Sequence, residues 1–222
     1  MISKRRPKVL VVISLACLIA FSSLLHVPVG RNLLLAGRKP EKKSKPEQGF
    51  ISLFDGKSLK GWIIMNGGKF EAKNGTIKLS GGSGWLRSAE EYDDFILRLE
   101  VRWLKPKQDS GIFLRATKEG SNWPKRRYEV QCENSPRIAR IFGAPHKRDV
   151  PLAAKTLKDS KQWNSYEIRC VKTRCEVKLN GQLVTTSDGF KRLKGYIGLQ
   201  GERGHLEFRN IRIKRLKKSD SR

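Results

Sequence analysis

Alternation of apolar and polar residues with a period of two dominates the chain from residue 49 onward. The longest example is FILRLEVRW at residues 95–103, in which every second residue is apolar and the residues between are mostly charged. Successive side chains of a strand point to opposite faces of its sheet, so this segment predicts a strand with one buried and one polar face. Shorter segments of the same kind follow at residues 112–115 and 128–133.

The polar positions of these three segments form the candidate site. If the strands are neighbours in one sheet, four polar side chains share a patch backed by a hydrophobic layer: Glu100, Arg115, Glu129 and Gln131. Carboxylate, guanidinium and amide groups held together in this way could bind a polar ligand or perform acid and base chemistry. Two alternatives remain open: Glu100 belongs to a cross-strand ladder of ion pairs with Arg98 and Arg102, or Glu129 and Arg115 form only a structural salt bridge.

Turn signals between the alternating segments predict an all-β fold. Asn-Gly pairs at residues 74–75 and 180–181 are typical of tight hairpins, because both residues accept a positive φ. No segment of the domain has a helical period, and residues 134–157 predict an irregular loop rich in Pro and Arg. Many short strands joined by such turns favour a β-sandwich or jelly roll.

The N-terminal part has a different character. An apolar run at residues 9–25 follows four basic residues, which predicts an N-terminal hydrophobic helix that directs export. The segment 1–29 is either a cleaved signal peptide or an uncleaved membrane anchor. We expect a basic flexible tether at 30–48, a single folded domain at 49–217 and a basic tail at 218–222.

The net charge of +26 raises the question of nucleic acid. Ten Lys and Arg residues precede residue 48, and the remaining charge is scattered along predicted strands rather than gathered on one helix. We therefore expect no nucleic-acid partner, although an adhesin for nucleic acid or another anionic polymer is one hypothesis that the charge allows.

Three cysteines fall in the predicted domain. Cys170 and Cys175 flank a short turn on one apolar face, so they form either a disulfide or two buried thiols. Cys132 has no evident partner and is interpreted as a core residue.

The order and spacing of seven segments resemble the 3-keto-disaccharide hydrolase family over residues 49–216. These segments are GFISLFDGKSLKGW, GWLRSAEEYDDFILRLEVRW, DSGIFLR, YEVQ, WNSYEIR, LNGQLV and GYIGLQGERGHLEFRNIRI. The resemblance implies a concanavalin A-like jelly-roll β-sandwich and a carbohydrate substrate. It also implies cleavage of glycosidic bonds in sugars already oxidised at C3.

Such a substrate needs a base rather than a pair of carboxylates about the scissile bond. A ketone at C3 acidifies the hydrogen at C2, so one base can remove that hydrogen and expel the glycosidic oxygen from C1. The resemblance implies Glu129 as this base and Arg115 as the group that stabilises the enolate oxygen. Glu202 is the second choice for acid or base, or else only a turn residue.

Binding roles are implied for other polar and aromatic residues. Gln131 would bind sugar hydroxyls or a metal, Glu100 would orient or ligate, and Gln200 would contact substrate. A divalent metal ion is a possible cofactor, although no clustered ligand motif is present. The alternative function is a non-catalytic carbohydrate-binding module, tethered to the membrane if the N-terminal segment is retained, in which Trp62 and Trp123 stack on sugar. The local pattern by itself favours a core aromatic at Trp62 over a sugar-stacking platform.

Overall fold

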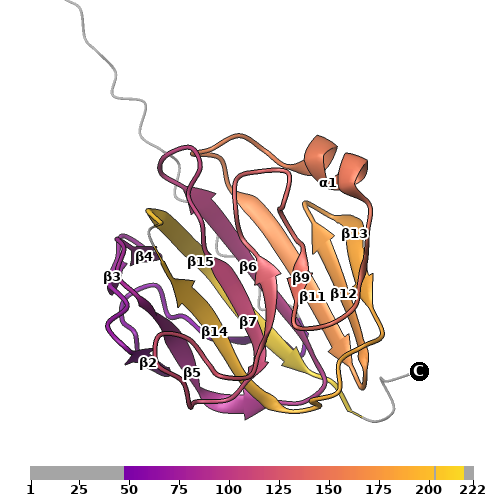
Figure 1. Cartoon of the computed structure of the whole chain (residues 1–222). Coiled ribbons are helices and arrows are strands. Elements are labelled where there is room, and N and C mark those ends of the chain that lie inside the picture. Colours follow the sequence, from indigo (N-terminus) through magenta and orange to yellow (C-terminus); the bar gives the residue numbers. More distant parts are fainter. Residues whose placement is uncertain (1–47, 203, 218–222) are drawn as a thin grey trace, which may run out of the picture. The chain divides into compact units, whose positions relative to one another are not determined.

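The computed structural model describes residues 48–202 and 204–217, which form a sandwich of two antiparallel β-sheets (Figure 1). The predicted N-terminal helix, tether and C-terminal tail lie almost entirely outside these residues. The larger sheet, sheet A, has the strand order β10-β13-β12-β11-β6-β15-β4-β3, with β1 also paired to β15. Its strands are β1 (Ile51–Ser52), β3 (Phe70–Lys73), β4 (Thr76–Leu79), β6 (Phe95–Trp103), β10 (Lys147–Arg148), β11 (Asn164–Val171), β12 (Arg174–Leu179), β13 (Gln182–Ser187) and β15 (Leu206–Arg215).

The second sheet, sheet B, has the order β2-β5-β14-β7-β8-β9. Its strands are β2 (Trp62–Met65), β5 (Gly84–Tyr92), β7 (Gly111–Ala116), β8 (Tyr128–Gln131), β9 (Ile141–Phe142) and β14 (Gly195–Gly201). The all-β sandwich expected from the alternating pattern is confirmed.

The alternation of apolar and polar residues along the strands determines which side chains form the core. In β6 the burial alternates without a break, with Phe95, Leu97, Leu99, Val101 and Trp103 on the inner face. The inner face of sheet B contributes Ile112, Leu114 and Val130 to the same core. Burying apolar side chains from both sheets contributes about 25 cal/mol per Å² of apolar area, which holds the two layers together.

Consecutive strands in the chain are not always neighbours in a sheet. β6 pairs with β11 and β15 in sheet A, whereas β7 and β8 pair with each other in sheet B. The three alternating segments of the predicted patch therefore belong to different layers. This topology separates Glu100 from the residues of β7 and β8.

The helix α1 (Val150–Thr156) lies in the stretch that was expected to be irregular. Asp149 caps it by accepting a hydrogen bond from the backbone N–H of Leu152 at 2.9 Å, and Pro151 occupies its first turn. Ala153 is its buried residue. Two turns are too short to show a helical period, so the prediction of a loop was wrong here. In the described part of the chain, no helix is long and apolar enough to cross a membrane.

Both predicted Asn-Gly hairpins are confirmed. Asn74 and Gly75 join β3 to β4 with φ values of 51° and 77°, and Asn180 and Gly181 join β12 to β13. Cys170 and Cys175 face each other across β11 and β12 as buried free thiols, with 3.4 Å between their sulfurs. Cys132 is fully buried in the core, where burial raises the pKa of its thiol to about 12.

Candidate functional site

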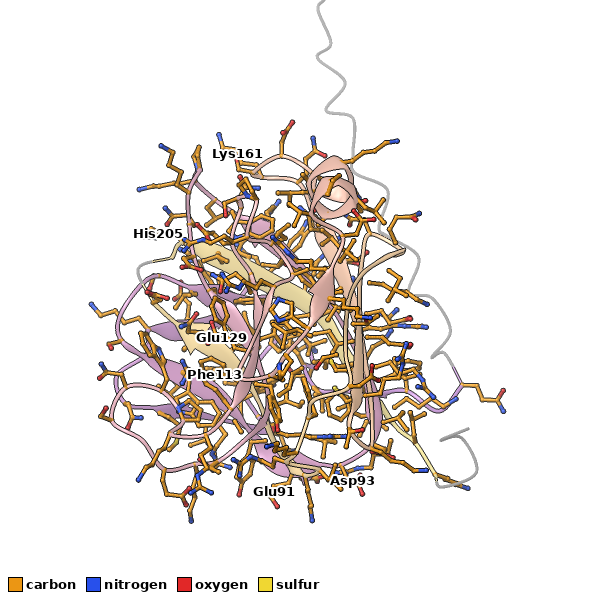
Figure 2. All side chains as sticks on the ribbon, turned by 45° about the vertical axis from the view of Figure 1, so that its right-hand side comes forward. Glu91, Asp93, Phe113, Glu129, Lys161 and His205 are labelled. Atoms are coloured by element: carbon orange, nitrogen blue, oxygen red, sulfur yellow. The ribbon has the colours of Figure 1, made fainter. Side chains whose placement is uncertain are left out.

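Sheet B presents a polar and aromatic outer face made of two rows of side chains that cross the strands. In the first row, Phe142, Glu129 and Phe113 are direct partners on β9, β8 and β7. Phe113 is in turn paired with Gly198 of β14. Figure 2 shows Glu129 beside Phe113 on this face. We call this line of side chains the Glu129 row.

The second row lies one pleat further along the strands. Gln131 of β8 pairs with Gly111 of β7, and Gln200 of β14 pairs with Trp85 of β5. The pairing of Leu199 with Ile112 places both pairs in the same line across the sheet. We call this line the Gln131 row.

Two glycines give these side chains room to lie flat on the sheet. A Cβ atom at Gly111 would lie 2.7 Å from Cγ and Oε1 of Glu129, so the carboxyl group rests directly against the β7 backbone. A Cβ atom at Gly198 would lie 2.5 Å from the ring of Trp85, which packs edge-on against Phe113 with 5.8 Å between ring centroids. The sheet thus carries a recessed floor below Glu129 and Trp85.

The loop between β7 and β8 covers this floor. Trp123 donates a hydrogen bond from its indole nitrogen to the carbonyl oxygen of Gly201 at 3.1 Å, which ties the loop to the end of β14. The Arg127 guanidinium lies 5.1 Å from the centroid of Phe113 and 5.8 Å from that of Trp123. Its Nε donates to Oε2 of Glu129 at 3.1 Å. Glu129 is 5% exposed beneath this cover.

Acidic side chains gather where the loop before β7 meets the two rows. Gln131 donates a hydrogen bond to Oδ1 of Asp109. Burial, with the charges of Glu202 and Glu133 adding to it, raises the pKa of Asp109 to about 6. Burial also raises the pKa of Glu129, and Glu202 adds to the rise while Arg127 opposes it. The charge of Glu202 therefore acts on both Asp109 and Glu129.

Three buried polar atoms on the same face have no hydrogen-bond partner among the described residues. One is Nε of Arg87, which is paired with Gly198 in line with the Glu129 row; the other two are the indole nitrogen of Trp85 and Oε1 of Gln200, which are neighbours in the Gln131 row. An unsatisfied buried donor and acceptor each cost about 1–3 kcal/mol. A ligand hydroxyl group, which both donates and accepts, could satisfy the atoms of Trp85 and Gln200.

Arg115 does not meet Glu129, so its expected place at the site was wrong. Phe113 and Ala116 both lie on the outer face with only two residues between them, because β7 bulges at Arg115, whose φ is 45°. The bulge directs the Arg115 side chain to a fully buried position, where it donates to the carbonyl oxygens of Asp93, Lys172 and Arg192 and to the carboxylate of Asp94. Asp93 lies at the lower end of the sandwich in Figure 2, well below Glu129.

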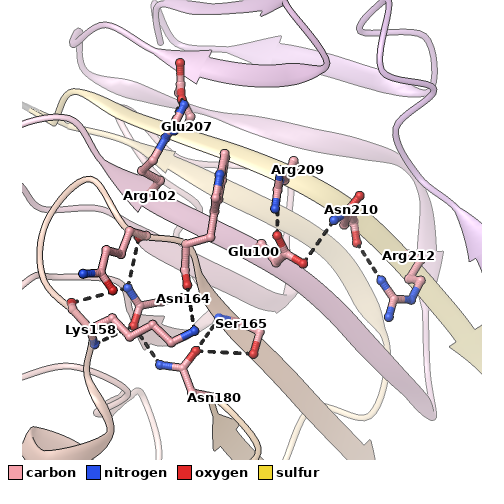
Figure 3. A network of polar contacts seen from close by, with 12 residues as sticks. Glu100, Arg102, Lys158, Asn164, Ser165, Asn180, Glu207, Arg209, Asn210 and Arg212 are labelled. Carbon is pink, nitrogen blue, oxygen red and sulfur yellow. Dashed lines mark hydrogen bonds and ion pairs between the residues drawn. The ribbon is translucent and has the colours of Figure 1, made fainter. Parts of the chain in front are cut away.

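Glu100 is likewise absent from the site. It lies on the outer face of sheet A, where it accepts hydrogen bonds from Arg209 at 2.7 Å and from Asn210 at 3.1 Å (Figure 3). Its strand neighbours are paired in the same way: Arg98 with Glu167 and Arg102 with Glu207. The alternative interpretation as a ladder of cross-strand ion pairs is correct for this strand.

Trp62 is a core residue, so its proposed stacking on sugar was also wrong. It is 7% exposed and belongs to the central hydrophobic cluster, and its indole nitrogen donates to the carbonyl oxygen of Leu53. Its strand neighbour Ser88 shows the same inward orientation. Trp123, by contrast, lies over the outer face of sheet B, as do Gln131 and Gln200.

Asp109 and Arg127 were missed from the sequence, although the pattern contained a signal for each. In DSGIF, a period of two places Asp109 on the same face as Gly111 and Phe113. In RYEVQ, it places Arg127 on the same face as Glu129 and Gln131. Extending the run at 112–115 by three residues, and the run at 128–133 by one, would have found both.

No group of three or more His, Cys, Asp or Glu side chains that could hold a metal ion occurs in residues 48–202 and 204–217. The Asp109, Glu129 and Glu202 carboxyl groups thus do not form such a centre.

Comparison of the structure with solved structures finds the same sandwich in other proteins. Two proteins of Parabacteroides distasonis, each provisionally described as a glycosyl hydrolase, superpose with TM-scores of 0.62 and 0.61 at 19% and 24% sequence identity. The matches cover 76% and 75% of this chain and 94% and 99% of those chains. A Bacillus subtilis protein of unknown function with a galectin-like fold matches with a TM-score of 0.54 at 14% identity, over 70% of this chain and 90% of that one. At these identities, the likeness shows the fold alone.

Sequence comparison identifies the family. Among curated proteins, none matches the sequence. The family model described as the 3-keto-alpha-glucoside-1,2-lyase-like domain matches residues 49–214, which span both sheets and every residue of the two rows. The chain therefore belongs to the family of 3-keto-alpha-glucoside-1,2-lyase-like domains.

Proposed function

We propose that this protein cleaves the glycosidic bond of sugars that carry a ketone at C3, by removing the proton from C2. The observation that carries the proposal is the position of Glu129 on a recessed face, held by Arg127 and roofed by Trp123, with Asp109 hydrogen-bonded to Gln131, the next outward-facing residue of β8. Membership of the family supports the substrate class.

The reaction is an elimination that can be followed by addition of water. A base takes the C2 proton, and the electron pair of the C2–H bond forms an enolate with the C3 carbonyl. The enolate then expels the C1 substituent, whose oxygen takes up a proton from an acid. The products at this stage are an unsaturated 3-keto sugar, with a double bond between C1 and C2, and a free alcohol. Addition of water across C1 and C2 then completes a net hydrolysis.

Glu129 is the proposed base and Asp109 the proposed acid. Glu129 carries its charge beside Arg127, and its raised pKa makes it a stronger base than an exposed carboxylate. Asp109, with a pKa of about 6, still holds a proton in mildly acidic solution and can give it to the leaving oxygen. Glu202 is the second choice for either role.

Arg127 takes the stabilising role that the sequence had suggested for Arg115. Its guanidinium is already at the carboxylate of Glu129, at 3.1 Å. Transfer of its hydrogen bonds to the C3 oxygen of the substrate would free Glu129 at the moment when the enolate charge develops. A hollow of about 450 Å³ lies along the covering loop and is lined by Trp123, Pro124 and Arg127 among others. Arg127 connects this hollow to Glu129, so the hollow offers room for part of the sugar.

The experiment compares matched pairs of disaccharides, one oxidised at C3 and the other not. We expect the full chain to release the leaving sugar only from the oxidised member of each pair. Glu129→Gln should abolish release while leaving binding within about threefold, because the amide keeps the shape but cannot accept the proton. Cleavage of the unoxidised sugar at an equal rate would contradict the proposed chemistry.

A second candidate function, sugar binding without turnover, is favoured by one observation. Glu129 is 5% exposed and paired with Arg127, as a structural ion pair would be. A binding module would retain both oxidised and unoxidised sugars through Trp123 and the Gln131 row and would release no product from either. The experiment above therefore separates the two functions.

Export is part of the same proposal. Its support is the apolar run at residues 9–25 behind basic residues. Fractionation of the producing cells, followed by N-terminal sequencing of the protein, would distinguish a cleaved signal peptide from a retained anchor. Recovery of the whole chain in the cytoplasm would contradict export.

A further inference from the structure

A hollow lined by basic side chains adjoins the candidate site at the end of the Glu129 row. It has a volume of about 360 Å³ and is lined by Lys125, Arg126, Arg127, Tyr128, Phe142, Gly143 and Arg192. Four of these residues are cationic and none is acidic. Phe142 connects the hollow to the site, because it is the direct strand partner of Glu129. We call this feature the basic hollow.

Three cations of the basic hollow lack the ion pairs that arginines on the outer face of sheet A make. On the outer face of sheet A, Arg98, Arg102 and Arg209 each pair with a glutamate. In the basic hollow, the structure gives Lys125, Arg126 and Arg192 no ion pair with any described residue. Like charges gathered without a counter-charge repel one another and attract anions.

Hydrogen-bonding capacity at the hollow is also unused. Nε of Arg192 is buried and has no hydrogen-bond partner among the described residues. The backbone around it is fixed, since its N–H donates to the hydroxyl of Tyr128 at 2.8 Å and its carbonyl oxygen accepts from Arg115. A buried guanidinium N–H without a partner is costly, and an anionic oxygen would satisfy it with a charge-assisted hydrogen bond.

We propose that the basic hollow binds an anionic sugar residue of the substrate, one that carries a carboxylate or a sulfate group. This inference rests on the proposed function and adds the class of substrate to it. Arg127 lines the hollow and contacts Glu129, so a glycan whose reacting sugar lies at Glu129 can place its next residue in the hollow. Phe142, with 37% of its surface exposed, offers an apolar surface for that sugar.

The test measures binding of three trisaccharide probes to the full chain by calorimetry: trigalacturonate, a sulfated trisaccharide and neutral maltotriose. We expect either or both anionic probes to bind at least about tenfold more tightly than maltotriose. The ratio between the two anionic probes identifies the acidic group. Equal affinity for all three probes, or no binding of either anionic probe, would overturn the inference.

Variants locate the binding. Arg126→Gln with Arg192→Gln should weaken binding of the preferred anionic probe by about tenfold or more and leave maltotriose unchanged. The matched control is Lys60→Gln with Lys155→Gln, which removes the same charge from exposed positions outside the hollow. An equal loss in the control pair, or tighter binding of a short single-stranded DNA than of the anionic sugars, would show general attraction of polyanions and overturn the inference.

Failure of this inference is distinguishable from failure of the proposed function. If a neutral 3-keto-disaccharide is cleaved and anionic sugars are not preferred, the enzyme proposal survives and the anionic subsite fails. If anionic sugars bind in the hollow and no 3-keto sugar is cleaved, the anionic subsite survives and the enzyme proposal fails.

Discussion

Two carboxyl groups on the outer face of sheet B differ in what stabilises their charge. Glu129 has the guanidinium of Arg127 at 3.1 Å, whereas Asp109 is half-buried near other acids and has an amide as its hydrogen-bond donor. A pair of groups whose environments separate their roles is the arrangement expected of an acid and a base. The chemistry of the site is therefore decided by a few side-chain contacts.

The first prediction at this scale is a bell-shaped pH dependence of kcat/KM. The rate should rise with pH as Glu129 loses its proton, above the ordinary range for a glutamate, and fall near pH 6 as Asp109 loses its own. Asp109→Asn should lower the rate about 100-fold and remove the fall near pH 6. Retention of that fall in the variant would assign it to another group.

The second prediction concerns stability. Asp109 has a pKa of about 6 in the folded protein, above the ordinary 3.8, so the folded state holds this proton more tightly than the unfolded state. Its contribution to the free energy of unfolding is thus fully present below about pH 4 and is lost as the pH rises to 6. Asp109→Asn, which stays neutral, should be more stable than wild type at pH 8 by about 2 kcal/mol, less than the full pKa shift would give because solvent screens the half-exposed carboxylate, and equal to it at pH 3. Urea unfolding at pH 3 and pH 8 measures this difference. Equal stability of the variant and wild type at pH 8 would show that folding does not raise the pKa of Asp109.

Single residues also show where prediction from the sequence ends. The faces of Glu129 and Gln131 followed from a period of two, and both lie on the outer face of sheet B. Gln200, which only the resemblance suggested, lies on the same face. Trp62 could not be placed in this way, because the choice between core and surface depends on which face of β2 meets the other sheet. That choice is made by the packing of the two layers.

At the scale of elements, β7 decides which side chains reach the site. Gly111 at its start admits Glu129, and the bulge at Arg115 turns the guanidinium out of the site. A period of two predicts Arg115 on the face of Phe113, and only the extra residue of the bulge changes this. Nothing in SGIFLRA marks a bulge, since its residue with positive φ is an arginine rather than a glycine.

The glycine at the start of β7 gives a third prediction. Gly111→Ala places a Cβ atom 2.7 Å from Cγ and Oε1 of Glu129, so the carboxylate must move away from its present position. A displacement of about 1 Å at a catalytic group can cost about 100-fold in rate. We expect kcat to fall by roughly that factor in a protein that remains folded by circular dichroism. An unchanged kcat would show that the position of Glu129 is not critical.

The bulge gives a fourth prediction. Arg115→Met removes the donor to three carbonyl oxygens and to Asp94, so the free energy of unfolding should fall by about 3 kcal/mol. The rate per folded molecule should stay near that of wild type. Arg127→Met is the comparison variant and should lose activity per folded molecule, because it removes the group that contacts Glu129. Loss of activity in folded Arg115→Met would contradict this prediction and show that Arg115 acts at the site.

At the scale of the whole molecule, the two outer faces of the sandwich have different characters. Sheet A carries cross-strand pairs of opposite charge, and sheet B carries the acidic group, the aromatic floor and the basic hollow. The alternating pattern predicted one polar patch shared by these strands, because β6 and β8 look alike in sequence. Their assignment to different sheets comes from long-range pairing of β6 with β11 and β15, which no local pattern encodes.

The central claim, that Glu129 removes the C2 proton, is tested most directly by proton NMR of a 3-keto-disaccharide incubated with the protein in deuterated water. For wild type, the account predicts that the C2–H signal disappears at the rate at which the C1–O bond breaks. For Glu129→Gln, it predicts neither change above the rate in buffer alone. Cleavage of the C1–O bond in molecules that retain their original C2 proton would contradict the account.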